Sequence, residues 1–367
     1  RLPKSMALRN KLLETSLAAF GQLKQHGGES PKMLADWATT LVALSDMAVA
    51  VDQREEAMRL RQEALAIREG LVHAEPDRAE WNRDLAVSYV LIGDLLDGPE
   101  QVAERRALYE KTLAIDEVLI ARQPDDVGII NNLAFDYERL GNLAKLRGDY
   151  PLAKSYFEKQ HVLALSLIER DTDNPSALWA MLCSMGQLAA MNEQAGDAAA
   201  AGRLRLDALS VTERLVALDP ENPEFVKAMV STAVSVAADQ LDSRSTAQLV
   251  RMEPLLRRFV EMEPENHDRK RDQAHYYLAL FGANHAVKDF ANAERYASRA
   301  LDVLHSLPAS AFDNPDQLRL VLTASDSLAI LAEERGDVEA RSAFSSEAAN
   351  AANQLEEKLG TDSATLI

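Results

Sequence analysis

Apolar residues recur at helical spacing along most of the chain. In the segment that follows Asp125, they fall at Ile130, Leu133, Tyr137 and Leu140, so that they line one face of a helix. The pattern stops at the sequence RGDY (residues 147–150) and resumes over residues 151–170. This segment is therefore predicted to form two amphipathic helices joined by a short turn.

The turn has residues suited to ending one helix and starting the next. Gly148 can take the left-handed conformation that ends a helix. Asp149 can cap the following helix, and Pro151 is tolerated in its first turn because an N–H there needs no partner. An RGD sequence recurs at residues 335–337, which predicts a second joint of the same kind.

The same landmarks recur at a fixed interval. Three sets of residues are separated by 48 positions: Leu17, Leu65 and Leu113; Gly93 and Gly141; Pro76 and Pro124. A fixed period of this size predicts a solenoid of stacked units.

The spacing of Tyr137, Leu140, Gly141, Ala153 and Phe157 resembles that of the tetratricopeptide repeat (TPR) family. The resemblance implies an all-α, right-handed α-α superhelix (a TPR-like solenoid) of about seven antiparallel helix pairs plus one N-terminal helix. It places Gly141 and Ala153 where the two helices cross, with Leu140 and Phe157 filling the space beside the crossing. The period exceeds the 34 residues of an ordinary TPR, so longer helices are expected.

Seven pairs are expected, and they begin near Ser30, Asp77, Asp125, Asn174, Asn222, Asn266 and Asn314. Residues 1–29 are expected to hold one helix, over residues 6–24, which aligns with the second helix of a truncated upstream repeat. Residues 30–222 form repeats one to four, and residues 223–264 form a degenerate fifth repeat. Residues 265–367 form repeats six and seven with a C-terminal capping helix.

Three repeats depart from the pattern. In the second, Arg105 replaces the expected small residue, which predicts a looser crossing. In the fourth, Gly186 is assigned to the crossing, which requires an insertion of about three residues before residues 208–211. The fifth has no crossing glycine, and Pro254 falls inside its second helix, so a kink and a bend are expected there.

Charge and cysteine content narrow the function classes. The 367 residues include 58 acids and 40 bases, and a net charge of −18 disfavours binding to nucleic acids and to anionic membranes. The single cysteine, Cys183, excludes an intramolecular disulfide and suits a reducing compartment. No uninterrupted apolar run of about 18 residues is present, so no membrane helix is expected. The family resemblance implies a cytoplasmic array of the long-period kind found in bacterial multidomain signalling and defence proteins.

The sequence offers no motif typical of catalysis. Phosphate-binding loops, dinucleotide-binding turns, zincin motifs and paired cysteines are missing, so we expect no enzyme activity, cofactor or metal. His275 and His285 share a predicted helix but lie about 80° apart around it. His161 falls at a leucine position and is expected to be packed. The basic run at residues 268–272 is either a solvated turn or a docking point for an acidic segment or phosphate.

The family resemblance also implies where a partner would bind. In such arrays, positions 2, 5, 9 and 12 of each first helix face the concave surface, and position 8 is assigned to Ser45, Gly93, Gly141 and Gly186. The resulting candidates are Thr39, Val42, Asp46, Asp94, Asp97, Phe135, Glu138, Asn142, Lys145 and Gln187. Position 9 forms a polar ladder between apolar side chains, which suits a segment with basic and apolar residues.

Members of the family that clamp an acidic C-terminus use lysine at position 5 and asparagine at position 9. Asn142 matches, but Val42, Val90 and Glu138 stand where the lysine belongs, so this activity is not expected.

Three functions remain open. The chain is expected to be a non-enzymatic scaffold that binds a partner protein on its concave face. The alternative is a sensor or regulatory region of a larger bacterial signalling or defence enzyme, whose caspase-like, TIR or NTPase domain lies outside this sequence and contacts the groove. A ligand- or RNA-binding module is the third, and the net charge opposes it.

Overall fold

The computed structural model describes residues 30–237 and 243–359, together with Lys11 and Thr15. Over this part of the chain all regular structure is helical, with 14 α-helices and two short 3₁₀ helices. The all-α prediction is therefore confirmed. The chain divides into two compact units, Arg1–Arg170 and Asp171–Ile367, which are described separately below.

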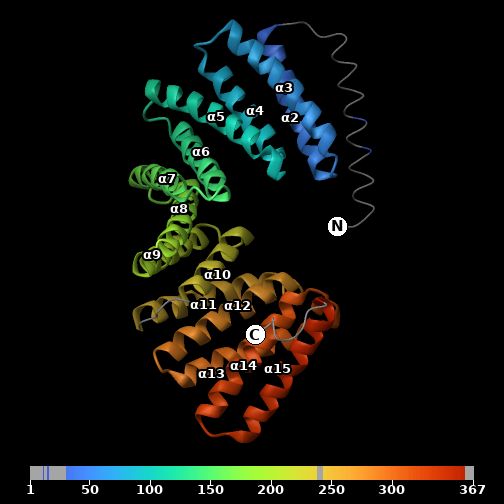
Figure 1. Cartoon of the computed structure of the whole chain (residues 1–367), viewed down its shortest axis with the longest axis vertical. Coiled ribbons are helices and arrows are strands. Elements are labelled where there is room, and N and C mark those ends of the chain that lie inside the picture. Colours follow the sequence, from blue (N-terminus) through green and yellow to red (C-terminus); the bar gives the residue numbers. More distant parts are fainter. Residues whose placement is uncertain (1–10, 12–14, 16–29, 238–242, 360–367) are drawn as a thin grey trace. The chain divides into compact units, whose positions relative to one another are not determined.

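Residues 30–170 of the first unit form three helical hairpins (Figure 1). Their helices are α2 (Pro31–Ala50) with α3 (Arg54–Ala74), α4 (Ala79–Leu95) with α5 (Val102–Arg122), and α6 (Val127–Leu146) with α7 (Tyr150–Arg170). A 3₁₀ turn, η1 (Pro99–Gln101), precedes α5. Each hairpin packs on the next, because α3 contacts α4 and α5 contacts α6.

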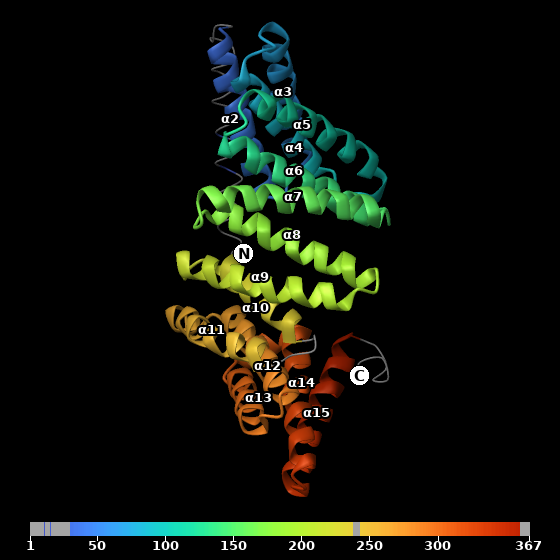
Figure 2. The same ribbon diagram turned by 90° about the vertical axis from the view of Figure 1, so that its left-hand side faces the viewer.

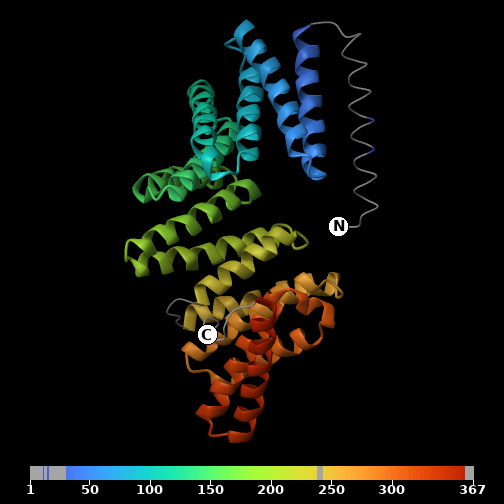
Figure 3. The ribbon, with the colours of Figure 1, turned by 45° about the vertical axis from the view of Figure 1, so that its right-hand side comes forward.

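The described residues of the second unit, 171–237 and 243–359, form four pairs of consecutive helices (Figure 2 and Figure 3). They are α8 (Pro175–Gln194) with α9 (Ala198–Leu218), α10 (Pro223–Ala237) with α11 (Ser243–Met262), α12 (His267–Ala286) with α13 (Phe290–His305), and α14 (Pro315–Glu334) with α15 (Val338–Leu359). The turn η2 (Ala309–Asp313) precedes α14. In this unit α10 contacts α9 and α12 more extensively than its own partner α11.

The predicted starts of the seven pairs are confirmed to within two residues. Local capping explains this accuracy, because side-chain oxygens of Ser30, Asp126, Asn174 and Asn314 accept backbone N–H groups in the first turn. The predicted helix over residues 6–24 lies outside the described residues except for Lys11 and Thr15, which are helical. The handedness of the stack stays a prediction.

Among the described residues, five hairpins turn through a residue with positive φ. Gly148 has φ of 76°, as predicted, and the other four are Asp52 (64°), Gly196 (82°), Lys288 (61°) and Gly336 (72°). The Asp149 carboxylate accepts the Leu152 N–H at 3.2 Å, which confirms the predicted cap of α7. Gly148 and Gly196 lie one period of 48 residues apart, as do Lys288 and Gly336.

Two glycines allow close crossing within a hairpin. A Cβ atom at Gly141 would lie 2.6 Å from Cε1 of Phe157, and one at Gly93 would lie 2.5 Å from Cε1 of Tyr109. Ala153 and Phe157 are fully buried, as predicted. An aromatic ring on the second helix therefore occupies the space that a larger residue at the crossing would need.

The assignment of Gly186 to the crossing in repeat four is wrong. Gly186 is exposed, and a Cβ atom there would have nothing within 4 Å. Since the joint Gly196 follows Gly148 by 48 residues, the register continues without an insertion and the crossing position is Ala189, which is 1% exposed. Gly186 resembled a crossing residue only because it is the one glycine in α8.

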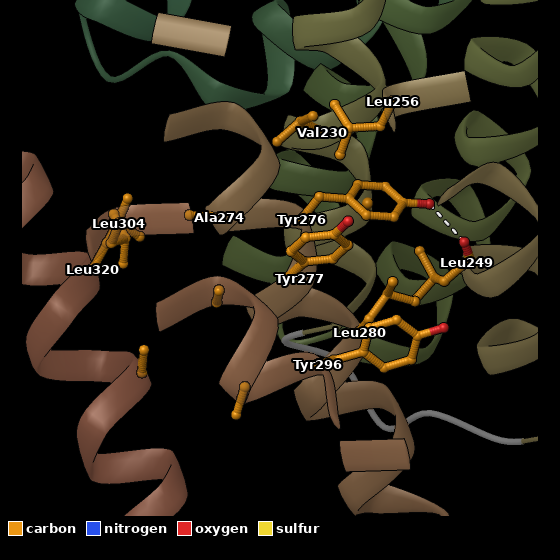
Figure 4. Close-up of a cluster of buried hydrophobic side chains, with 14 of the residues drawn as sticks. Val230, Leu249, Leu256, Ala274, Tyr276, Tyr277, Leu280, Tyr296, Leu304 and Leu320 are labelled. Carbon is orange, nitrogen blue, oxygen red and sulfur yellow. Dashed lines mark hydrogen bonds between the residues drawn. The ribbon is translucent and has the colours of Figure 1, made fainter. Parts of the chain in front are cut away.

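Pro254 lies inside α11, which continues through it from Ser243 to Met262. The apolar face of this helix is buried at Leu249 and Leu256, and the Tyr276 hydroxyl of α12 donates a hydrogen bond of 2.6 Å to the Leu249 carbonyl (Figure 4). Residues 238–242, between α10 and α11, lie outside the described residues. The predicted bend in this repeat stays a prediction.

By length and composition, α2 is the one described helix that could cross a membrane. A core helix passes the same test. In this unit Ala38, Leu41 and Leu44 of α2 are buried in a cluster with Leu60 and Ala64 of α3. We therefore assign α2 to the first hairpin.

Candidate functional site

A cavity of about 150 Å³ lies between α4, α5 and α6 in the first unit. Its walls include Val87 and Val90 from α4 and Phe135 from α6, which occupy predicted concave-face positions 2 and 5. The other lining residues are Ala86, Leu91, Thr112, Asp116, Asn132, Asp136 and Arg139. The predicted face of the first helices is therefore hollowed within this unit.

Two carboxylic acids line the cavity at the junction of the second and third hairpins. Asp116 of α5 and Asp136 of α6 are each 1% exposed, and their carboxyl groups share a hydrogen bond. Burial raises the pKa of both groups, and the Asp116 carboxylate further raises the pKa of Asp136. The pair therefore retains a proton at neutral pH.

Two arginines lie near this acid pair. Arg139 Nη1 is 3.8 Å from Asp136 Oδ1, and its Nε is 3.7 Å from Asp94 Oδ1. The positive charge of Arg83 on α4 lowers the pKa of Asp116, opposing the larger effect of burial, but its guanidinium is bound at 2.6 Å by Asp126. Neither arginine makes a short ion pair with the acid pair.

The preceding hairpin junction has different chemistry at the same repeat positions. Arg68 and Ser88 lie 48 residues before Asp116 and Asp136. Arg68 Nη1 donates to the Ser88 hydroxyl and to the Asp84 carbonyl, both at 2.9 Å. A buried cation and a hydroxyl thus occupy the positions that two acids occupy in the next junction.

The second unit has a larger groove, of about 590 Å³, between α10, α12 and α14. Counted from the joint at Lys288, His275 and Leu278 of α12 are positions 2 and 5, and both line the groove. Most of the remaining lining is apolar: Val234, Ala237, Ala279, Phe281, Gly282 and Leu320, with Asp316, Arg319, Thr323 and Ser327. Burial lowers the pKa of His275, with a smaller contribution from Arg271.

The position 9 acids are exposed but already have partners in their own hairpins. Asp46 Oδ1 pairs with Arg61 Nη2 at 3.0 Å. Asp94 Oδ1 accepts from the Tyr109 hydroxyl at 2.7 Å. In both cases the partner lies 15 residues later, on the second helix.

Six other predicted residues lie on first helices of this unit. Glu138 is half-buried and accepts from Gln160 Nε2 at 3.0 Å, and Thr39 donates its hydroxyl hydrogen to the Ala35 carbonyl. Val42, Asn142 and Lys145 are of intermediate exposure, as is Phe135 in the cavity wall. Their role in binding a partner stays a prediction.

Two of the predicted positions need correction. Asp97 is not on a first helix, because α4 ends at Leu95 and Asp97 instead pairs with Arg54 at 2.9 Å. The Gly98–Pro99 sequence explains the early end, since the residue before a proline disfavours the helical conformation. In repeat four the corrected register assigns position 9 to Ala190 rather than Gln187, which lies on α8.

The sequence reasoning missed Asp116 and Asp136. A signal was present, because both acids interrupt apolar stretches of their helices and lie one period after Arg68 and Ser88. Periodicity alone does not indicate that two such positions on neighbouring hairpins face each other.

Within the part of the chain that the structure describes, no group of three or more His, Cys, Asp or Glu side chains could hold a metal ion. His285 packs between the rings of Phe281 and Phe290 and lies 3.4 Å from Glu334. In the basic run, Arg269 pairs with Glu263 at 3.0 Å and Arg271 with Asp268 at 2.9 Å. These cations thus have acidic neighbours of their own.

No known protein-family model and no curated protein matches this chain. Among solved structures, it is similar to BtubC from P. vanneervenii, with 16% identity and a TM-score of 0.45 over 69% of this chain and 91% of that one. It is similar to the C-terminal part of a TPR repeat-containing protein from Cytophaga hutchinsonii, with 13% identity and a TM-score of 0.42 over 84% and 98%. A nuclear import adaptor of S. pombe is 12% identical, with a TM-score of 0.45 over 91% and 96%. Because these scores are below 0.5, the assignment of helical hairpins rests on the helix contacts described above.

Proposed function

We propose that this chain is a non-enzymatic scaffold that binds a protein segment on the face formed by the first helices of its hairpins. The observation that carries the proposal is the position of the two hollows. In the first unit, positions 2 and 5 of α4, Val87 and Val90, line the smaller hollow. In the second unit, positions 2 and 5 of α12, His275 and Leu278, line the larger one.

The chemistry of these hollows suits a segment with apolar and basic residues. Valine, leucine and phenylalanine side chains form the walls, and carboxyl groups lie among them in both hollows. An amphipathic helix or extended segment presents apolar anchors at the spacing that such a row of pockets requires. The net charge of −18 attracts basic partners over longer distances.

Site-specific crosslinking tests this proposal with two matched valines. Val87 on α4 is 43% exposed on the proposed face, and Val118 on α5 is 53% exposed on a second helix. We expect a photoreactive phenylalanine analogue at residue 87 to capture a partner of defined mass in cells, and the same analogue at residue 118 to capture none. Equal capture at both positions, or capture only at residue 118, contradicts the proposal.

The same experiment separates the alternative in which the face contacts other domains of a longer bacterial signalling or defence protein. In that case the adduct of residue 87 maps to the same polypeptide rather than to a second one. Cytoplasmic location stays a prediction.

A further inference from the structure

We propose that the cavity between α4 and α6 binds the guanidinium group of an arginine from a partner protein, with Asp116 and Asp136 as its acceptors. The inference rests on the proposed function, because it names the chemistry of the segment that the scaffold would bind.

The acid pair has unused hydrogen-bonding capacity. Apart from the hydrogen bond that the two acids share, Asp116 Oδ1 and Asp136 Oδ2 are buried and accept no hydrogen bond from the other described residues. Buried acceptors without a donor are rare in native proteins, since each costs about 1–3 kcal/mol. A guanidinium carries five N–H donors in one plane and can serve both carboxyl groups at once.

In the junction between the first and second hairpins, the equivalent repeat positions accommodate a guanidinium group. There Arg68 is 4% exposed and donates from one nitrogen to both Ser88 and the Asp84 carbonyl. One period later, Asp116 and Asp136 offer acceptors at both equivalent positions, and the guanidinium of Arg139, which lines the cavity, stays 3.8 Å from Asp136. A guanidinium from another protein would supply the missing group.

The cavity has the size and walls for such a group. Its volume of about 150 Å³ equals that of an engineered protein cavity that holds a benzene ring. Phe135 offers a ring on which a planar guanidinium can stack, and Val87 and Val90 can pack against the methylene groups of an arginine. A lysine ammonium would match neither the two acceptors nor the aromatic wall as well.

Arg139 is the side chain that must move. It lines the cavity, is 30% exposed, lies 5.9 Å from the centre of the Tyr109 ring, and makes long ion-pair contacts of 3.7 and 3.8 Å to Asp94 and Asp136. Because both acids are nearly inaccessible, an incoming guanidinium reaches them when Arg139 turns toward solvent. The pair then loses its shared proton to solution, so binding strengthens as pH rises.

Two small probes test this inference on the full chain. N-acetyl-arginine methylamide carries the guanidinium, and N-acetyl-citrulline methylamide is its neutral isostere. In ligand-observed NMR titrations we expect saturable binding of the arginine probe at least about tenfold tighter than that of the citrulline probe. We also expect tighter binding at pH 8 than at pH 6. Equal binding of the two probes to the unmodified chain overturns the inference.

Variants locate the binding group. Asp116→Asn and Asp136→Asn should each weaken the arginine probe about tenfold, with circular dichroism confirming that the helices remain. Asp326→Asn, on α14 of the other unit, should leave the affinity unchanged. Retention of arginine binding in both cavity variants overturns the inference.

The outcome is separable from that of the scaffold proposal. If a partner is crosslinked at residue 87 but the arginine probe does not bind, the scaffold proposal stands and the arginine site is rejected. Probe binding without any crosslinked partner rejects the scaffold and leaves a pocket for free guanidinium compounds.

Discussion

Gly141 and Gly186 both lie within first helices, yet their surroundings predict opposite effects of the same substitution. A Cβ atom at Gly141 would lie 2.6 Å from the Phe157 ring, whereas one at Gly186 would meet nothing within 4 Å. We expect Gly141→Ala to lower the free energy of unfolding by about 1–3 kcal/mol through overpacking. Gly186→Ala should raise it by about 0.5–1 kcal/mol, because alanine is the better helix former. Urea denaturation measures both, and a loss of stability in Gly186→Ala would restore that residue to the crossing.

Individual joint residues show what local sequence signals can and cannot predict. Gly148 was predictable, since glycine adopts positive φ readily and sits between two helical patterns. Lys288 was not, because a lysine with φ of 61° runs against local preference. Only its distance of one period from Gly336 indicates the joint, and the surrounding hairpin imposes the conformation.

At the scale of elements, the packing of α5 on α6 makes stability depend on pH. Burial and the Asp116 carboxylate raise the pKa of Asp136 to about 8. The folded chain therefore keeps a proton that the unfolded chain loses above about pH 4. Between about pH 4 and pH 8, unfolding releases this proton, so the free energy of unfolding falls as pH rises through this range. The charges of Arg83 and Arg139 oppose this effect without reversing it.

Asp136→Asn should remove most of this pH dependence. Between pH 5 and pH 8 we expect the unmodified chain to lose on the order of 2 kcal/mol more unfolding free energy than the variant. Urea denaturation at both pH values gives the comparison, with Asp36→Asn as a control at an exposed residue of α2. Parallel pH profiles for the unmodified chain and Asp136→Asn would show that the acid pair does not hold a proton in the folded state.

The ends of helices were predictable where capping residues mark them, and were not predictable where the sequence departs from the 48-residue repeat. Asn174 and Asn314 accept backbone N–H groups of the first turn and mark helix starts in the sequence. The prediction placed Asp97 on the first helix, two residues beyond the end of α4 at Leu95, because it extended the 48-residue period through this segment. Gly98 and Pro99 indicated the earlier end. The two acids stood out in the sequence, but their contact could not be predicted, since periodicity fixes the face of each helix and not which side chains meet across a junction.

For the whole chain, seven helix pairs followed from the 48-residue period, whereas the division into two units did not. Each repeat has a similar apolar pattern, so the sequence does not distinguish a stronger junction from a weaker one. The division follows from the contacts between residues in the folded chain. Tyr109, Leu140 and Leu143 belong to one cluster of the first unit, and a separate cluster of the second unit extends from Leu209 to Ala351.

Because stability in repeat arrays comes from neighbouring elements, each unit should fold by itself. We expect residues 30–170 and residues 171–359, made as separate chains, to be helical and to unfold cooperatively on heating, as followed by circular dichroism. A cut between residues 148 and 149 is the control, because it separates Gly141 from Phe157 and divides the α6–α7 hairpin. The fragment that ends at residue 148 should be less stable than residues 30–170, since α6 then loses the helix that buries Leu140 and Leu143. If neither 30–170 nor 171–359 folds alone, the clusters within each unit are not sufficient for stability.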